Sequence, residues 1–338
     1  MENKILIVAE LSANHNGKLE TAIESIKAIK RTGANAVKLQ TYTADSITID
    51  CDKSDFQINY GSHWDGQTMH QLYQQAYTPW EWHEELFRIA REEGLICFSS
   101  PFDKSAVDFL EKLDNPIYKI ASPEITDIPL IEYVASKKKP IILSTGVATK
   151  DDIQLAIETC RQVENDEITV LKCTSSYPAP IEEANLAVIP DLATRFNVKV
   201  GLSDHTIGVT APMVATALGA TMIEKHFIID RSIGGPDAFF SMNESEFTNM
   251  VKNIREVESS LGEINYSLTE KQLKSKEYCR SLYIVQDVKM GDIITEENVR
   301  SIRPGYGLHP KYLPKILGKK VNRDLKKGDR MSLEYLQE

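Results

Sequence analysis

Short apolar segments that end at polar residues alternate with amphipathic stretches along most of the chain. The amphipathic stretches, such as 21–33, 82–94 and 151–163, have the spacing of helices that cover a sheet. The apolar segments are 5–11, 36–41, 95–102, 116–122, 140–146, 168–174, 198–205 and 222–227. Eight strand–helix units over about 250 residues predict an α/β fold, a closed (β/α)8 TIM barrel. Because such barrels carry their chemistry at the C-terminal ends of the strands, the polar residues there are the candidate site.

The pattern changes after Gly262. Residues 1–262 are predicted to form the barrel domain, 263–279 a polar linker, and 280–338 a small β-rich domain. The last region repeats the motif D-x-K-x-G-D at 287–292 and 324–329. Glycine in this motif suits a tight turn with positive φ, so the repeat predicts two similar turns.

A long insertion, 42–78, separates the second predicted strand from its helix. It contains GSHWDG at 61–66, and excursions of this length inside a compact domain are usually functional. The helix that follows is expected to begin at Thr78 as N-cap with Pro79 in its first turn.

Composition and charge argue against several classes of protein. The formal net charge is −10, which argues against a nucleic acid or an anionic membrane as partner but permits an anionic small substrate. The five cysteines form an odd set without CxxC spacing, which disfavours a disulfide framework or a zinc knuckle. The N-terminus resembles no signal peptide and no segment is apolar enough to span a membrane, so a cytoplasmic protein is expected.

Two histidines end neighbouring predicted strands. His205 ends the seventh strand and His226 the eighth, and adjacent strands lie about 4.8 Å apart. Two imidazoles at this separation can bind one divalent ion and leave positions open for substrate and water. A single buried histidine is usually structural, but this pair favours a metal site.

Lysines occur within two of the apolar segments. Lys38 and Lys119 must point into the barrel mouth or suffer desolvation, and each has a salt bridge as its structural alternative. Together with Ser122, Ser144 and Ser203 at other strand ends, they suggest a cradle for phosphate and carboxylate. A Schiff base at Lys119 is an alternative. Lys172 and Lys225 fall on the opposite face of their strands by the alternation of side chains and are interpreted as structural.

Carboxylates complete the candidate site. Glu10 in the first strand and Glu124 after the fourth are expected to handle protons, or to balance the lysine charges. Asp237, in a Gly-Gly-Pro-Asp turn after the eighth strand, either reaches the site or caps a helix, and Tyr177 either covers a substrate or fills the rim.

Several motifs together resemble those of the sialic acid synthase family: AELSANHNG, VKLQTY, FSSPFD, YKIASPE, LSTG, KCTSSYPAP, GLSDHT, EKHF and GGPD. The tail, with RSLY and SIRPGYG, resembles the antifreeze-like (SAF) domain of these synthases. Within the family, WDGQTMHQLYQQAYTPWEWH, SSPFDKSAVDFL and IRPGYGLHPKYL are most similar to the branch that makes pseudaminic acid.

The resemblance implies that phosphoenolpyruvate condenses with 2,4-diacetamido-2,4,6-trideoxy-β-L-altrose and water, with C–O cleavage, to give pseudaminic acid and phosphate. It implies a divalent metal on His205 and His226, manganese before magnesium or cobalt. Phosphoenolpyruvate would be held by Lys38, Ser100, Lys119, Ser122, Ser144, Ser175 and Ser203. The amino sugar would be contacted by Gln40, Tyr177 and Asp237, with Glu10 and Glu124 near the reacting carbons. Arg303 would reach the barrel of a partner subunit in a domain-swapped homodimer.

Three alternatives remain open from the sequence. A sibling synthase would make N-acetylneuraminic or legionaminic acid, and the insertion is the expected discriminator because a 6-deoxy sugar needs an apolar wall. A Schiff-base aldolase would use Lys119 and no metal. A non-enzymatic carbohydrate- or ice-binding protein is suggested only by the antifreeze-like tail.

Overall fold

The computed structural model describes residues 4–59, 61 and 64–337. The chain divides after Gly262 into two compact units, and each is described by itself. Ser62 and His63 of the predicted functional insertion lie outside the described residues. None of the helices in the described part of the chain combines the length and the apolarity that crossing a membrane requires.

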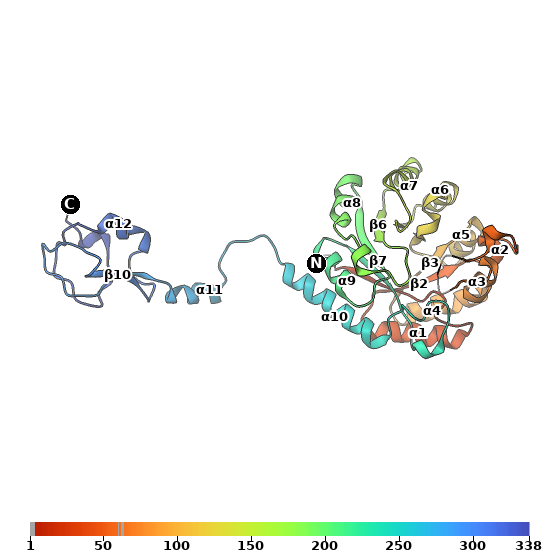
Figure 1. Ribbon diagram of the computed structural model, residues 1–338, viewed down its shortest axis with the longest axis horizontal. Coiled ribbons are helices and arrows are strands. Elements are labelled where there is room, and N and C mark those ends of the chain that lie inside the picture. The colour runs from red at the N-terminus through yellow and green to blue at the C-terminus, as the bar shows by residue number, and fades with distance from the viewer. Residues whose placement is uncertain (1–3, 60, 62–63, 338) are drawn as a thin grey trace. The chain divides into compact units, whose positions relative to one another are not determined.

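The first unit is a closed barrel of parallel strands, each paired with the next along the chain, with β8 returning to β1 (Figure 1). The strands are β1 (Leu6–Glu10), β2 (Ala36–Thr41), β3 (Ile96–Pro101), β4 (Tyr118–Ile120), β5 (Ile141–Ser144), β6 (Ile168–Cys173), β7 (Lys199–Asp204) and β8 (Met222–His226). Each lies within one of the apolar segments, so the predicted TIM barrel is confirmed.

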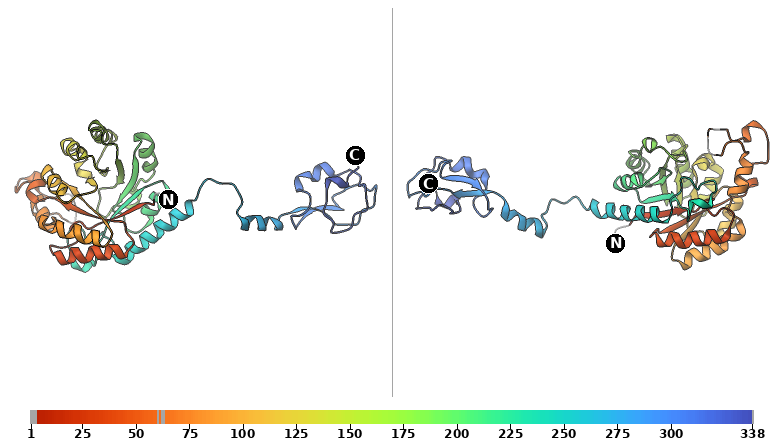
Figure 2. Two further views of the ribbon diagram at one scale, coloured as in Figure 1. Left: turned by 180° about the vertical axis from the view of Figure 1, so that it is seen from behind. Right: turned by 60° about the horizontal axis from the view of Figure 1, so that its bottom comes forward.

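Helices surround the strands (Figure 2). They are α1 (Leu19–Arg31), α4 (His83–Glu92), α5 (Lys104–Glu111), α6 (Ile128–Ala135), α7 (Lys150–Gln162), α8 (Val188–Phe196), α9 (Thr210–Ala217) and α10 (Glu244–Leu261). Their apolar faces pack on the outward side chains of the strands and form the main hydrophobic core. This is the expected result for amphipathic helices beside strands that are buried on both faces.

A second, smaller core fills the inside of the barrel. It consists of Val8, Ala36, Phe98, Ile142, Leu171 and Met222. Side chains alternate along a strand, so the next inward position lies two residues further toward the C-terminal end. On β2 and β8 that position is Lys38 and Glu224, so the apolar layer forms the floor beneath a charged layer.

The insertion after β2 contains two helices, α2 (Ala44–Ile47) and α3 (Met69–Ala76). The expected helix start at Thr78 is wrong. Residues 80–82 form a 3-10 turn, and α4 begins only at His83. The hydroxyl of Thr78 instead lies 3.2 Å from Nε2 of His15, so the side chain is used in a tertiary contact and does not cap the helix.

The second unit has its own hydrophobic core, which includes Leu282, Ile284 and Val299. Its elements are α11 (Glu270–Ser275), β9 (Ser281–Ile284), β10 (Val299–Ile302) and α12 (Leu313–Ile316), with β9 and β10 antiparallel. Helix α11 lies inside the stretch expected to be a linker.

The repeated D-x-K-x-G-D motifs pair with each other. Lys289 Nζ lies 2.7 Å from Asp324 Oδ2, and Lys326 Nζ lies 3.1 Å from Asp287 Oδ2. The glycine of the second motif, Gly328, has a φ of 96°, as the predicted turn requires. The two copies therefore form a reciprocal clasp in which the lysine of each motif binds the first aspartate of the other.

Candidate active site

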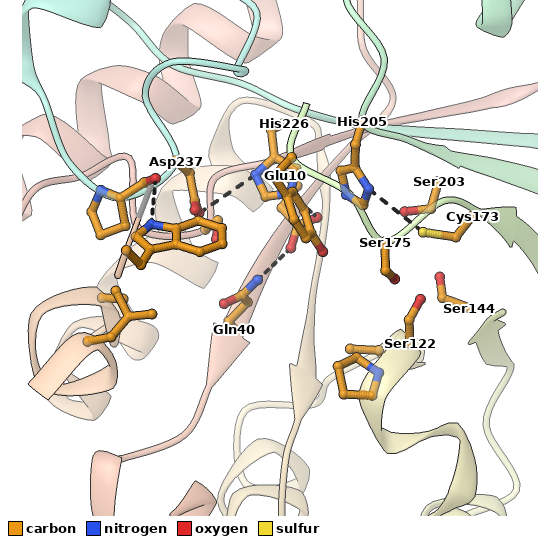
Figure 3. Close-up of a pocket in the computed structure, with 18 of the residues that line it drawn as sticks. Glu10, Gln40, Ser122, Ser144, Cys173, Ser175, Ser203, His205, His226 and Asp237 are labelled. Atoms are coloured by element: carbon orange, nitrogen blue, oxygen red, sulfur yellow. Dashed lines mark hydrogen bonds and ion pairs between the residues drawn. The ribbon is translucent and has the colours of Figure 1, made fainter. Parts of the chain in front are cut away.

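A cavity of about 610 Å³ opens at the C-terminal ends of the barrel strands (Figure 3). Twelve residues expected at the site line it: Glu10, Lys38, Gln40, Lys119, Ser122, Ser144, Ser175, Tyr177, Ser203, His205, His226 and Asp237. The other lining residues come mainly from the insertion and from the loops after the strands. Side chains from every strand except β3 thus meet in one space.

The two histidines lie side by side, with ring centroids 5.3 Å apart. His205 Nδ1 is 3.0 Å from the carbonyl oxygen of Thr174, which can only accept a hydrogen bond. This contact places the ring proton on Nδ1 and leaves Nε2 as a lone-pair donor for a ligand. Burial lowers the pKa of His226 and so favours the neutral imidazole, which is the form that binds metals.

Carboxylates flank His226. Its Nε2 is 3.3 Å from Glu10 Oε2, and its Nδ1 is 3.8 Å from Asp237 Oδ2 and has no hydrogen-bond partner within the described residues. No set of three or more His, Cys, Asp or Glu side chains within residues 4–59, 61 and 64–337 is arranged to hold a metal ion. The donors fit a divalent ion held by two imidazoles, with the remaining positions left to water and substrate.

Below the histidines, four charged side chains form a buried network. Lys38 Nζ is 2.7 Å from Glu10 Oε1 and 3.3 Å from Glu224 Oε1. Lys119 Nζ is 2.8 Å from the same Glu224 oxygen. Two ammonium groups and two carboxylates balance, so this charged layer, which we call the quartet (Glu10, Lys38, Lys119 and Glu224), carries no net charge.

The quartet favours the charged forms of Glu10 and Lys38, whereas burial lowers the pKa of Lys119. Although burial opposes it, the charges of Lys38, His226 and Lys119 hold the pKa of Glu10 far below its usual value. Against the same burial, Glu10 and Glu224 raise the pKa of Lys38. Glu10 therefore balances the lysine charges, as one of the two sequence interpretations expected, and it also lines the cavity.

Glu224 is the functional residue that the sequence analysis missed. Glu224 directly precedes Lys225, which the sequence analysis assigned to the outer face of β8. The signal was present, because a strand with Lys225 outward and His226 at the site must also turn Glu224 inward. Lys225 is indeed on the outer side, where its ammonium group pairs with Asp204.

Serine hydroxyls gather on the side of the cavity opposite Asp237 and Gln40. Figure 3 shows Ser122, Ser144, Ser175 and Ser203 together on this side, with Glu10 and His226 between the two groups. The Oγ atoms of Ser144 and Ser175 are buried without a hydrogen-bond partner within the described residues. Unsatisfied buried hydroxyls are costly unless a ligand uses them, so this group is suited to an anion.

Gly146 makes room for the serines. A Cβ atom at this position would lie 2.0 Å from Ser175 Oγ and 2.8 Å from Ser122 Oγ. Its backbone N–H also donates to Ser122 Oγ at 3.0 Å. The glycine of the LSTG segment therefore holds Ser122 through its backbone N–H. Because it has no side chain, it also leaves the space that the serine hydroxyls occupy.

The remaining expected residues are placed as follows. Gln40 Nε2 donates to Glu10 Oε1 at 2.8 Å, and the Tyr177 ring lies 4.4 Å from that of His205. Ser100 is buried but does not line the cavity. Glu124 does not line it either, and burial raises its pKa to about 7. Arg303 is exposed on the second unit.

Comparison with known proteins identifies the family of the chain. The NeuB family model matches residues 25–266, and the SAF domain model matches residues 280–329. The chain is 49% identical to the pseudaminic acid synthase of Campylobacter jejuni over 97% of this chain and 95% of that protein. It is 48% identical to the pseudaminic acid synthase of Helicobacter pylori over 98% of this chain and 97% of that protein.

A solved structure shares the architecture. The crystal structure of the N-acetylneuraminic acid (sialic acid) synthetase of Leptospira borgpetersenii superposes with a TM-score of 0.72 at 28% identity, covering 81% of this chain and 90% of that chain. The resemblance to sialic acid synthases is thereby confirmed. The chain belongs to the NeuB family and carries a SAF domain at its C-terminal end.

Proposed function

We propose that this chain is a pseudaminic acid synthase. It would condense phosphoenolpyruvate with 2,4-diacetamido-2,4,6-trideoxy-β-L-altrose and water, giving pseudaminic acid and phosphate. The observation that carries the proposal is the composition of the cavity. Serines and lysines on one side suit an anion, Gln40 and Asp237 lie on the other side, and the histidine pair lies in the same cavity. The near full-length similarity to pseudaminic acid synthases from two genera selects the sugar.

Phosphoenolpyruvate would bind beside Lys38 and Lys119. The unpartnered hydroxyls of Ser144 and Ser175, together with that of Ser122, would donate to its phosphate or carboxylate oxygens. Ser203, whose hydroxyl donates to Glu224 at 3.0 Å, would complete the serine side. Ser100 does not line the cavity, so the geometry gives no support to its expected contact with phosphoenolpyruvate. Because the quartet is neutral, it cannot by itself neutralise a multiply charged anion, so hydroxyl donors and a cation must supply the difference.

His205 and His226 would hold a divalent metal ion, for which manganese is our first choice. When bound, such an ion acts as a Lewis acid that polarises an aldehyde oxygen. The residues of the chain would orient the two substrates face to face, which removes translational freedom before the carbon–carbon bond forms. Gln40 and Asp237, which both line the cavity, would contact the hydroxyl and acetamido groups of the sugar.

In the reaction, C3 of phosphoenolpyruvate attacks the aldehyde carbon and C2 becomes electron-poor. Water adds to C2, and the tetrahedral product releases phosphate by cleavage of the C2–O bond. One proton of the water ends on the new sugar hydroxyl, and the other leaves with the phosphate as C2 becomes a ketone. Glu10 lies within the cavity but is held ionised, whereas Glu124 has a pKa of about 7, which suits proton exchange near neutrality. Single-turnover rates of Glu10→Gln and Glu124→Gln assign the role, because the residue that moves the proton is the one whose loss slows the chemical step.

We also propose the finer features that the family resemblance implies. These are a barrel domain at 1–262, a linker at 263–279, a SAF domain at 280–338, and a domain-swapped homodimer in which Arg303 reaches the partner's cavity. A cytoplasmic location is supported by the five cysteines, all of which are free. Size-exclusion chromatography with light scattering, together with phosphoenolpyruvate binding by Arg303→Ala, tests the dimer and the reach of the arginine.

The experiment that tests the proposed function offers purified protein each candidate sugar with phosphoenolpyruvate labelled with ¹⁸O at the bridging oxygen. Turnover of the altrose derivative with the label in the released phosphate is expected. Turnover only of the N-acetylneuraminic or legionaminic precursor would favour the sibling synthases. A product trapped on Lys119 by borohydride would favour the aldolase, and we expect none because Lys119 is engaged with Glu224.

A further inference from the structure

Helix α3 turns an apolar face toward the cavity. Met69, Leu72, Tyr73 and Ala76 recur at the spacing of one helix face, and all four line the cavity. None of the eight residues of Met69–Ala76 is buried. A surface helix normally buries such a stripe against the protein, so this face is turned to the cavity where a ligand would cover it.

The helix is held firmly in this orientation. Thr68 and Gln71 form a capping box, with Gln71 N donating to Thr68 Oγ1 at 3.1 Å and Thr68 N donating to Gln71 Oε1 at 2.9 Å. On its flank, His70 Nε2 lies 2.9 Å from Asp45 Oδ1. The start of α3 is thus well defined, and one of its side chains contacts α2.

The wall continues beyond α3 and is tied to the sugar side of the cavity. Ile58 and Trp64 of the insertion also line the cavity, and Trp64 Nε1 donates to the carbonyl oxygen of Pro236 at 3.2 Å. Pro236 directly precedes Asp237, which lies opposite the serine cluster (Figure 3). The cavity thus has a polar side for an anion and an apolar wall next to Asp237.

We propose that this wall, formed by Ile58, Met69, Leu72 and Ala76, receives the deoxygenated C6 methyl end of the amino sugar and excludes sugars with a hydroxyl at C6. The inference rests on the proposed function, which fixes the other end of the sugar at the histidines. Ile58, Met69, Leu72 and Ala76 offer only aliphatic and thioether groups. A C6 hydroxyl placed there would lose its water without gaining a good partner, whereas a methyl group would gain apolar contact.

The test compares two aldehydes that differ only at C6: the 2,4-diacetamido-2,4,6-trideoxy-altrose and its 6-hydroxy counterpart, each with saturating phosphoenolpyruvate. The wild-type protein is expected to favour the 6-deoxy sugar in kcat/KM by at least about tenfold. Leu72→Gln, which places a hydrogen-bonding group on the wall, is expected to reduce this ratio by about tenfold, mainly through KM for the sugar. Leu72→Met keeps the wall apolar and should retain the preference.

Gln74→Ala is the matched control, because Gln74 is exposed on the opposite face of the same helix. An unchanged ratio in Leu72→Gln, with native thermal unfolding, overturns the inference. If Leu72→Gln does not fold, Met69→Gln makes the same test one turn earlier. Failure of the wild-type protein to use either sugar would instead refute the proposed function, so the two failures are distinguishable.

Discussion

Lys119 donates to Glu224 across the inside of the barrel, with Nζ and Oε1 2.8 Å apart and both side chains buried. The same Glu224 oxygen lies 3.3 Å from Lys38 Nζ and 3.0 Å from Ser203 Oγ. One carboxylate therefore positions two ammonium groups and one of the serines of the proposed anion site. Glu224 acts through these residues, so we regard it as a positioning residue.

Glu224→Gln should be strongly destabilising, because removal of one partner leaves the charges of Lys38 and Lys119 insufficiently compensated in the barrel. Breaking a buried ion pair typically costs about 3–5 kcal/mol, and we expect a loss of about 3 kcal/mol in the free energy of unfolding measured by urea denaturation. Glu111→Gln serves as control, because Glu111 pairs with Lys139 at 2.6 Å on the partly exposed surface. Equal losses in the two variants would contradict the importance of the quartet.

Gly146→Ala is expected to raise KM for phosphoenolpyruvate by about tenfold with little change in stability. The new methyl group would meet Ser175 Oγ and Ser122 Oγ, at 2.0 and 2.8 Å before any adjustment, and these hydroxyls can move only by leaving the anion site. The loss corresponds to about 1.4 kcal/mol, roughly one hydrogen bond. Steady-state kinetics and calorimetric titration with phosphoenolpyruvate measure it.

The control is the effect of Gly146→Ala measured in a protein that already carries Ser175→Ala. If the methyl group acts by displacing the Ser175 hydroxyl, Gly146→Ala should cost less in this background than in the wild type. Fully additive effects on KM would show that the glycine matters for another reason.

The pH dependence of stability should show the contribution of Glu124. Burial raises its pKa from 4.5 to about 7, so the folded protein holds a proton that the unfolded chain has already lost. Below pH 4.5 the carboxyl is protonated in both the folded and the unfolded state, so its burial does not reduce the free energy of unfolding through ionisation. As the pH rises toward 7, the free energy of unfolding falls by at most about 3 kcal/mol, because the unfolded chain loses this proton first. Glu124→Gln should remove this decline. Urea denaturation at pH 4.5 and pH 7.5 compares the two proteins, and identical pH dependence would refute the raised pKa.

Metal removal should abolish phosphate release. A chelator is expected to stop turnover, and added Mn²⁺ should restore it, because His205 and His226 would hold the ion. His205→Ala and His226→Ala should each weaken Mn²⁺ binding at least about tenfold in calorimetric titration. His70→Ala is the control, since His70 pairs with Asp45 and does not line the cavity. Full activity in excess chelator would rule out the metal.

Local sequence was enough to identify the barrel, because its signals are short-range. Each strand is a short apolar run, and each outer helix carries an apolar stripe, so both kinds of element can be recognised from neighbouring residues. Lys38, His205 and His226 were found in the same way, since a charged residue within an apolar run, or a histidine at its end, stands out. The start of α4 was misplaced, because Thr78 is a good cap by composition but is used in a contact with His15, which is distant in the chain.

What the sequence alone determined is therefore which side chains reach the mouth of the barrel. The tertiary structure decided which of them meet: it paired Glu224 with two lysines, made the quartet neutral, kept Ser100 and Glu124 out of the cavity wall, and turned the apolar face of α3 toward the cavity. Such pairings join strands and loops far apart in the chain, and their energies depend on distance and burial. Those quantities exist only once the barrel has closed.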